Sequence, residues 1–365
     1  MSDTAGGPHD TVPVRPGEAL DAAALTVWLH ASAPELLGSS TEPIEVSQFG
    51  GGFSNLTYRV SVGTRTMVLR RPPRGVARGV AHDMGREYRL LSALHPAGVP
   101  VPRALAYCDD DSVLGAPFYL MEYVSGVILR QTPPDGARFD ADVAGELANV
   151  FVRQLVALHA LDVRAIGLST LGRAEGYVSR QVSGWTKRWV ASRTSDVRVM
   201  EDVAAWLASS QPAEFGIALL HNDFKYDNLV LDPGDLTHIR AILDWEMATI
   251  GCPLMDLGTS LAYWVEAGDP PMLRALGLGI TAAAGSLSRS ELVRAYESAS
   301  GRSVGDPVFY YVYGLFKLAV VAQQIYARHV RGLTSDPRFA RLDAAVLLLA
   351  QLAASAIDTQ LLGRS

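Results

Sequence analysis

The sequence has few of the residues on which several protein classes depend. It contains only two cysteines in 365 residues, Cys108 and Cys252, which excludes a disulfide framework and favours a reducing compartment. The eight histidines are scattered without the spacing of metal ligands, so we expect no zinc site. Neither G-x-S-x-G nor G-x-x-x-x-G-K-[ST] occurs, which argues against a serine hydrolase and against a P-loop NTPase.

Long apolar runs are also scarce. The most apolar run covers residues 344–357 and is shorter than the roughly 20 residues of a membrane span. We predict a buried C-terminal helix there and no transmembrane segment. The first ten residues, MSDTAGGPHD, have neither the basic start nor the apolar stretch of a signal peptide. We therefore expect a soluble cytoplasmic protein with no membrane partner.

Charge and composition narrow the class further. The chain has 32 basic and 38 acidic residues and a formal net charge of −6, which argues against nucleic acid as a partner. Hydrophobic residues make up 48% and charged residues 19%, a composition that excludes an intrinsically disordered chain. The length suggests about two domains.

The hydrophobic pattern changes along the chain. We expect a mobile tail over 1–16, a helix beginning near Leu20, and helical spacing again from Met84 to Leu94. Strand patterns occupy 44–49, 56–62, 66–70 and 113–124. Most of the remainder has helical spacing, over 142–161, 176–192, 197–209, 289–300, 306–330 and 338–359, around a strand-like island at 217–245. These patterns predict an α+β protein with a β-rich lobe at 17–124 and a helical lobe at 125–365.

A glycine-rich loop separates the first two strand patterns. Its residues are Gly50, Gly51, Gly52, Phe53, Ser54 and Asn55. Glycines let backbone N–H groups approach a polyanion, although a plain hairpin turn also explains them. A dinucleotide-binding fold requires a helix after the glycines, whereas a strand pattern follows here.

A polar motif lies in the strand-like island. His221, Asp223 and Asn228 form H-x-D-x-x-x-x-N, and Asp244 follows an apolar run. Kinases use this order: the loop Asp accepts a hydroxyl proton, and the Asn and the later Asp bind Mg²⁺. Mg²⁺ keeps water and phosphate ligands, so two protein ligands suffice. Together with the upstream glycine loop, the motif indicates an ATP-dependent phosphotransferase.

The chain resembles the aminoglycoside phosphotransferase/choline kinase-like branch of the protein-kinase-like fold over nearly all of residues 40–332. Residues 172–182 (GRAEGYVSRQV), 244–258 (DWEMATIGCPLMDLG) and 325–332 (IYARHVRG) resemble a subgroup that includes the kinase domains attached to some acyl-CoA dehydrogenases. The resemblance implies a bilobal protein-kinase-like fold with ATP in the cleft.

The resemblance also implies a function for each motif residue. The loop from Gly50 to Asn55 covers the ATP phosphates, Arg70 contacts the α- and β-phosphates, and Glu87 pairs with Arg70. Asp223 is the catalytic base, and Asn228 and Asp244 are the Mg²⁺ ligands. The adenine pocket is bordered by Met121, with backbone groups of Glu122 and Val124 binding the base.

Several positions depart from the family pattern or allow another interpretation. Arg70 replaces the usual lysine, and Asn222 stands where glycine is usual. Arg70 and Glu87 could instead form an ordinary surface ion pair. We expect His221 to be a structural hydrogen-bonding residue and Asp256 to be a buried carboxylate at a helix start or supporting a loop. Lys225 is a candidate phosphate contact.

The helical lobe indicates the acceptor. Residues 173–198 carry six basic and two acidic side chains, and 309–332 contain no Asp or Glu. A polycationic aminoglycoside requires carboxylates, so this charge favours an anionic acceptor such as a hydroxy acid or hydroxyacyl-CoA. The candidate acceptor residues are Arg180, Trp185, Arg188 and Trp189. A solvated basic face with the tryptophans in the core also explains the pattern.

We therefore expect a small-molecule kinase that uses ATP and Mg²⁺. An aminoglycoside phosphotransferase is the alternative acceptor assignment. A catalytically inactive nucleotide-binding module is a second alternative, although the predicted base and metal ligands are present. A protein kinase is a third, but no activation segment or A-P-E element is evident between Asp244 and Asp256.

Overall fold

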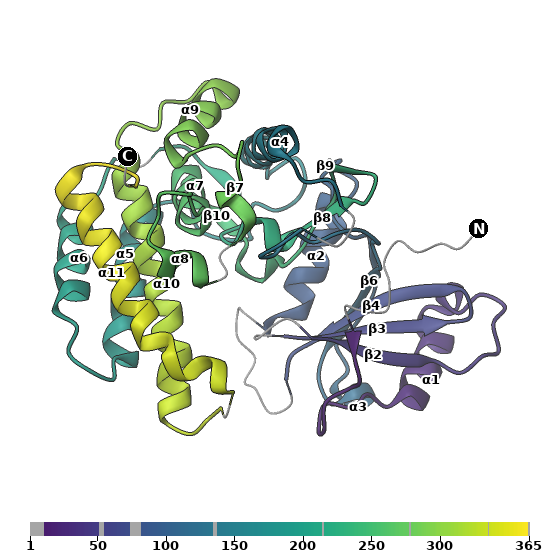
Figure 1. The fold of residues 1–365 in the computed structure, drawn as a ribbon. Coiled ribbons are helices and arrows are strands. Elements are labelled where there is room, and N and C mark those ends of the chain that lie inside the picture. The colour runs from purple at the N-terminus through teal and green to yellow at the C-terminus, as the bar shows by residue number, and fades with distance from the viewer. Residues whose placement is uncertain are drawn as a thin grey trace. The chain divides into compact units, whose positions relative to one another are not determined.

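The structure, a computed structural model, describes residues 11–50, 55–73, 82–133, 137–213, 215–276, 279–334 and 336–363. The chain divides into two compact units (Figure 1). The first, here called the sheet unit, comprises Met1–Val127, Leu229–Asp235 and Ile239–Met247. The second, here called the helical unit, comprises Ile128–Asn228, Leu236–His238 and Ala248–Ser365.

The sheet unit is built on a six-stranded antiparallel sheet with the strand order β1-β2-β3-β4-β6-β5. Its strands are β1 (Thr11–Val12), β2 (Glu45–Phe49), β3 (Leu56–Val62), β4 (Arg65–Arg71), β5 (Ala104–Cys108) and β6 (Phe118–Glu122). Its helices are α1 (Ala22–Ser32), α2 (Met84–Leu94), α3 (Asp111–Leu114) and the 3-10 helices η2 (Pro34–Leu36) and η5 (Trp245–Met247). β8 (Leu229–Asp232) and most of β9 (Asp235–Ile242) complete the unit.

Side-chain alternation on the strands separates the core from the candidate site. The pattern predicted for 56–62 is confirmed, because every second residue of β3 is buried. On β4, Met67 and Leu69 join the core formed with Leu25 and Leu29 of α1. Arg70 therefore projects from the opposite face of the sheet.

In this unit one predicted strand is wrong at its start and one observed strand was missed. The continuous strand predicted over 113–124 is wrong at its start, because Asp110 caps a helical turn at Ser112 N (2.8 Å) and Gly115 ends that turn with φ 81°. β5 was not predicted. The predicted helix near Leu20 exists as α1, and Leu25 and Leu29 form its buried face.

The predicted tail and lobe boundary can be located in part. Residues 1–10 of the predicted tail lie outside the described residues, and Thr11–Val12 form β1, which pairs with β2. The first unit extends to Val127, and it also includes later residues. Val127 pairs with Leu231 of β8, and Ile242 N donates to Pro100 O (2.7 Å), which explains why this later hairpin groups with the sheet unit.

In its described residues, the helical unit contains the six helices predicted from the sequence and two helices that were not predicted, Pro253–Tyr263 and Pro271–Ala275. These helices are α4 (Ala141–His159), α5 (Tyr177–Ser192), α6 (Arg198–Ser209), α7 (Pro253–Tyr263), α8 (Pro271–Ala275), α9 (Arg289–Ser300), α10 (Pro307–Val330) and α11 (Leu342–Thr359). Short elements complete it: β7 (Ala218–Leu220), β10 (Thr249–Gly251), η4 (Tyr226–Asn228), η6 (Ile280–Ala282) and η7 (Pro337–Arg341). β7 and β10 pair antiparallel.

α10 is the central helix of this unit and packs against α5, α6, α7 and α11 (Figure 1). Its crossing with α7 is close, because a Cβ added to Gly314 would lie 2.3 Å from Gly258 O. A Cβ at Gly258 would lie 2.2 Å from Tyr310 O. Glycine at both positions therefore allows the two backbones to approach each other.

Among the described residues, two helical stretches are long and apolar enough for a membrane span by length and composition, Pro307–Val330 and Pro337–Thr359. In the first, 78% of the apolar window is buried inside the protein, as in a core helix. In the second, 33% is buried. The predicted buried C-terminal helix is therefore buried on one side only, with Leu347 45% exposed.

Candidate functional site

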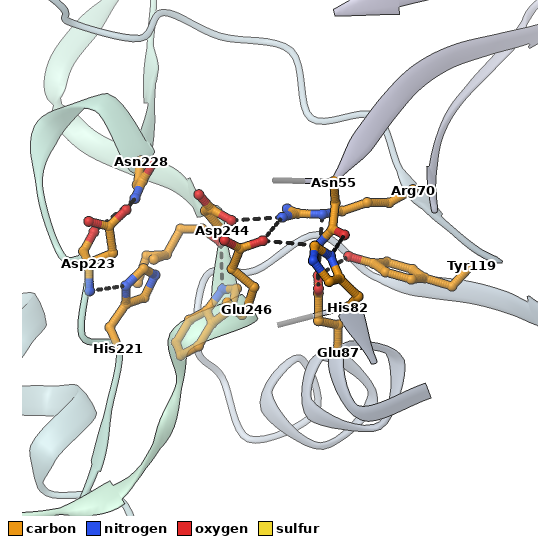
Figure 2. Close-up of polar contacts among 12 residues, drawn as sticks. Asn55, Arg70, His82, Glu87, Tyr119, His221, Asp223, Asn228, Asp244 and Glu246 are labelled. Carbon is orange, nitrogen blue, oxygen red and sulfur yellow. Dashed lines mark hydrogen bonds and ion pairs between the residues drawn. The ribbon is translucent and has the colours of Figure 1, made fainter. Parts of the chain in front are cut away.

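Arg70 lies at the centre of a polar cluster in the sheet unit (Figure 2). Its guanidinium contacts three carboxylates: Asp244 at 2.8 Å, Glu246 at 3.0 Å and Glu87 at 3.4 Å. Tyr119, the cross-strand partner of Arg70, donates its hydroxyl to Glu87 at 3.0 Å. The side chains of Arg70 and Glu87 are 11% and 3% exposed, so an ordinary surface ion pair does not describe this contact.

The charges in this cluster depend on each other. Burial opposes the charge of Arg70, but Glu87, Asp244 and Glu246 raise the pKa of Arg70 well above its ordinary value. Burial raises the pKa of Glu87, while Arg70 and the Tyr119 hydroxyl act in the opposite direction. The arginine is thus a permanent cation that compensates a group of carboxylates.

Asn55 connects the end of the glycine-rich loop to the same carboxylates. Its amide nitrogen donates to Glu246 at 2.9 Å and to Glu87 at 3.3 Å. Its amide oxygen lies 2.8 Å from His82 Nδ1. Gly50 follows β2, whereas Gly51, Gly52, Phe53 and Ser54 lie outside the described residues.

The predicted adenine-binding residues lie at the end of β6 and just after it. Met121 is buried, Glu122 is exposed and Val124 is half-buried. Glu122 N already donates to Arg103 O at 2.9 Å. The Glu122 N–H is therefore bonded within the protein, and the contact of Glu122 and Val124 with the base stays a prediction.

The loop of the helical unit that contains Asp223 is also buried and extensively hydrogen-bonded (Figure 2). Lys225 Nζ lies 3.0 Å from Asp223 Oδ2, and Asn228 Nδ2 donates to Asp223 Oδ2 and to Asp223 O, both at 2.8 Å. Asp223 N donates to His221 Nδ1 at 3.2 Å, as expected for a structural histidine. Lys225 also lies over the Tyr263 ring, 4.5 Å from its centroid.

Electrostatics keep the Asp223 carboxyl ionised. Burial alone would raise the pKa of Asp223, but Lys225, Tyr263, His221 and Lys317 lower it, and the net shift is downward. A carboxylate that is ionised at neutral pH can accept a proton from an alcohol as the phosphoryl group is transferred.

Asn222 precedes Asp223 and has a left-handed backbone, with φ 63°. Glycine, the usual family residue, adopts this conformation freely, and asparagine is among the residues that tolerate it best. Asp256 accepts from His221 N (2.7 Å) and Asn222 N (2.8 Å) and is fully buried in the first turn of α7. The prediction that Asp256 supports a loop is therefore confirmed.

The predicted metal ligands offer suitable oxygen atoms. Because the Asn228 amide nitrogen donates to Asp223, the amide oxygen is the atom that Asn228 presents to a cation. The Asp244 side chain is 36% exposed, and Arg70 contacts its Oδ1. The backbone of Asp244 is left-handed, with φ 64°. An amide oxygen and a carboxylate fit the preference of Mg²⁺ for hard oxygen ligands.

The four candidate acceptor residues of α5 differ in their surroundings. Arg180 donates to the main-chain carbonyls of Arg173 and Glu175. Arg188 lies over the Trp185 ring, 4.6 Å from its centroid, and among the described residues no carboxylate lies within 4.0 Å of its guanidinium. Trp185 and Trp189 are 6% and 2% exposed, so both belong largely to the core.

Three further residues of these clusters were not predicted as site residues. Glu246 follows Asp244 by two positions, and its place in the quoted motif could have identified it. Tyr119 shares the strand face of Met121, which alternation alone could have shown. Lys317 donates to Asn222 O at 2.6 Å, and its only signal is a single charge in an apolar helix pattern.

Comparison with known proteins gives one family match and several long alignments. Residues 45–288 match the phosphotransferase enzyme family. Mouse acyl-CoA dehydrogenase family member 10 is 35% identical over 90% of this chain. The chain covers only 30% of that relative's length.

Solved structures give a similar result. A candidate aminoglycoside phosphotransferase from Ralstonia eutropha is 30% identical, covers 92% of this chain and 99% of its own, and has a TM-score of 0.75. Choline kinase from Cryptosporidium parvum is 13% identical, covers 93% of this chain and 97% of its own, and has a TM-score of 0.60, a likeness of fold alone. The predicted protein-kinase-like fold is thus confirmed.

Proposed function

Because the chain belongs to the phosphotransferase enzyme family, we propose that it transfers the γ-phosphoryl group of ATP to a hydroxyl of a small anionic molecule. A hydroxy acid or a hydroxyacyl-CoA has the required chemistry. The observation that supports the anionic assignment is Arg188 of α5, which is exposed and, among the described residues, has no carboxylate within 4.0 Å of its guanidinium.

In this proposal Asp223 is the base. Its carboxylate takes the hydroxyl proton, the acceptor oxygen bonds to the γ-phosphorus, and the bond from that phosphorus to the bridging β–γ oxygen breaks to release ADP. The Asn228 amide and Lys225 orient the Asp223 carboxylate. Arg70 contacts the phosphates, and Glu87 and Glu246 orient its guanidinium.

Asn228 and Asp244 would hold Mg²⁺, with the remaining ligands from water and phosphate. When bound, the ion neutralises charge on the β- and γ-phosphates. This assignment is supported by the fixed amide orientation of Asn228 and by the accessible carboxylate of Asp244.

Two relatives suggest different acceptors for this chain. The name of the Ralstonia structure favours an aminoglycoside, whereas the name of the mouse relative favours acyl-CoA chemistry. An aminoglycoside is a polycation, and the exposed Arg188, which has no carboxylate partner among the described residues, would repel it. Arg188, stacked on Trp185, is the candidate contact for a carboxylate or phosphate.

The proposal is tested by measuring ADP release from Mg·ATP with a panel of acceptors. The panel contains short hydroxy acids, hydroxyacyl-CoAs and aminoglycosides such as kanamycin, with each corresponding deoxy compound as its control. We expect turnover with an anionic alcohol and none with its deoxy analogue. Turnover of aminoglycosides alone would contradict the anionic assignment, and binding of ATP without any turnover would favour the inactive nucleotide-binding module.

A further inference from the structure

We propose that Lys317, a buried lysine of α10, is a positioning residue that fixes the backbone at Asn222 and thereby directs Asp223. The inference rests on the proposed function, because it concerns the orientation of the proposed base. Lys317 does not need to contact either substrate for this purpose.

The first observation is the number of contacts made by Asn222. Asp256 Oδ1 accepts from its backbone N–H at 2.8 Å, and Lys317 Nζ donates to its carbonyl oxygen at 2.6 Å. The Tyr177 hydroxyl donates to its side-chain oxygen at 3.2 Å. Both backbone polar groups of this left-handed residue are therefore fixed by charged side chains from two different helices.

The second observation is the energetic cost of burying the ammonium group of Lys317. Lys317 is 2% exposed, and among the described residues no carboxylate lies within 4.0 Å of Nζ. Burial lowers the pKa of Lys317 to about 8, while the carboxylates of Asp223 and Asp256, which lie farther than 4.0 Å from Nζ, act in the opposite direction. A buried charge without an ion pair is destabilising, so an apolar side chain would serve packing better. The one hydrogen bond described for Lys317 is to Asn222 O in the loop that contains Asp223. We infer that this hydrogen bond is the reason for a lysine at this buried position.

The third observation is how α10 reaches the loop. Lys317 lies one helical turn after Gly314, the residue at the close crossing with Gly258 of α7. α7 also carries Asp256, two residues before Gly258. The crossing thus sets the positions of Lys317 and Asp256 relative to each other, so the turn at Asn222 has a defined geometry.

Because Asp223 follows Asn222 directly, rotation at Asn222 would change the direction of the Asp223 carboxylate. Loss of the Lys317 contact leaves the Asn222 carbonyl oxygen without this donor. A displacement on the order of 1 Å at a reacting group costs about 100-fold in rate. Lys317 therefore acts on turnover through Asp223, and we expect little effect on ATP binding.

The test compares Lys317→Met with Gln323→Met. Gln323 is an equally buried polar residue of the same helix, and it donates to Ser192 O and Thr194 Oγ1, away from the catalytic loop. One readout is hydrogen exchange of the backbone amides of residues 221–224. The second is ADP release from Mg·ATP with water as the acceptor, with the ATP dissociation constant measured by titration.

We expect Lys317→Met to speed exchange of these amides by about 10-fold or more, as for loss of a hydrogen bond to a charged group. ADP release should fall by about 10- to 100-fold with an unchanged ATP dissociation constant. Gln323→Met should change neither quantity, whatever its effect on the melting temperature. Unchanged exchange in Lys317→Met, or equal changes in both variants, would overturn the proposal.

Two additions keep the result interpretable. If Lys317→Met does not fold, Lys317→Gln provides a second variant, because its amide is one bond shorter and loses the contact with Asn222 O. Asp223→Ala separates this inference from the proposed function. If Asp223→Ala releases ADP at the wild-type rate, the base assignment fails, whereas the exchange measurement still reports whether Lys317 fixes the loop.

Discussion

Arg70 Nη2 lies 2.8 Å from Asp244 Oδ1, so the residue predicted to contact ATP phosphate bonds directly to the carboxylate predicted to hold Mg²⁺. The two residues are 174 positions apart in the sequence and belong to the same compact unit. Arg70 compensates Asp244, Glu246 and Glu87 together. A change at Arg70 therefore alters both the phosphate contact and the charge of the predicted metal ligand.

Arg70→Met should raise the KM for ATP and lower kcat, because a charge-assisted contact to phosphate is lost. We expect a decrease in kcat/KM of roughly 10- to 100-fold. Glu87→Gln should give a milder change in the same direction. Arg65→Met is the control, since Arg65 lies at the other end of β4 and donates only to Glu35 O among its described hydrogen bonds. Wild-type kinetics in both Arg70→Met and Glu87→Gln would show that Arg70 and Glu87 form an ion pair with a structural role only.

Lys225→Met should shift the pH dependence of kcat/KM. Lys225 lowers the pKa of Asp223 below the ordinary value of 3.8, and the active base is the deprotonated form. Removing this cation raises the pKa of Asp223, so the acidic limb of the profile should move to higher pH. Lys187→Met, a change at an exposed lysine of α5, should leave the limb in place. An unmoved limb in Lys225→Met would show that Asp223 does not control it.

Gly314→Ala should destabilise the protein, because the new Cβ would lie 2.3 Å from Gly258 O at the crossing of α10 and α7. Overpacking of this kind costs about 1–3 kcal/mol, and more when backbone must move. The matched control is Gly184→Ala in α5, where the nearest atom, 3.4 Å away, is the end of the Arg188 side chain. The control should be neutral or slightly stabilising, since alanine favours helix. Denaturant unfolding of both variants measures the difference, and equal stabilities would contradict the close crossing.

Arg188→Glu should raise the KM of an anionic acceptor more than the KM of ATP, and more so at low ionic strength. Arg180→Glu is a control on the same helix, because the guanidinium of Arg180 already bonds to two main-chain carbonyls. The comparison requires an acceptor from the panel above. Equal effects of the two variants on the acceptor KM would show that Arg188 does not contact the acceptor and belongs to a solvated basic face.

Local patterns in the sequence predicted most of the fold. Alternation on β3 and helical spacing over 289–300 and 306–330 correspond closely to the observed elements. The short strand β5 and the turn α3 were missed or misassigned, because pairing of β5 with β6 and capping by Asp110 outweigh weak local preferences.

The candidate site was predictable only where a motif is continuous in the sequence. His221, Asp223 and Asn228 lie within one loop, and their contacts agree with their spacing. The contacts of Asn55 with Glu246 and of Lys317 with Asn222 join segments 191 and 95 positions apart. No local pattern encodes such pairs, because they depend on how strands and helices pack.

Formation of a phosphate ester decides whether this chain is a small-molecule kinase with an anionic acceptor. The measurement is ³¹P NMR of the products from Mg·ATP and the acceptor that gives turnover in the panel, with wild-type protein and with Asp223→Asn. We predict one phosphomonoester on an anionic acceptor per ADP formed, with a rate about 10²- to 10⁴-fold lower in Asp223→Asn. ADP accompanied only by inorganic phosphate, an ester formed only on an aminoglycoside, or an undiminished rate in Asp223→Asn would contradict it.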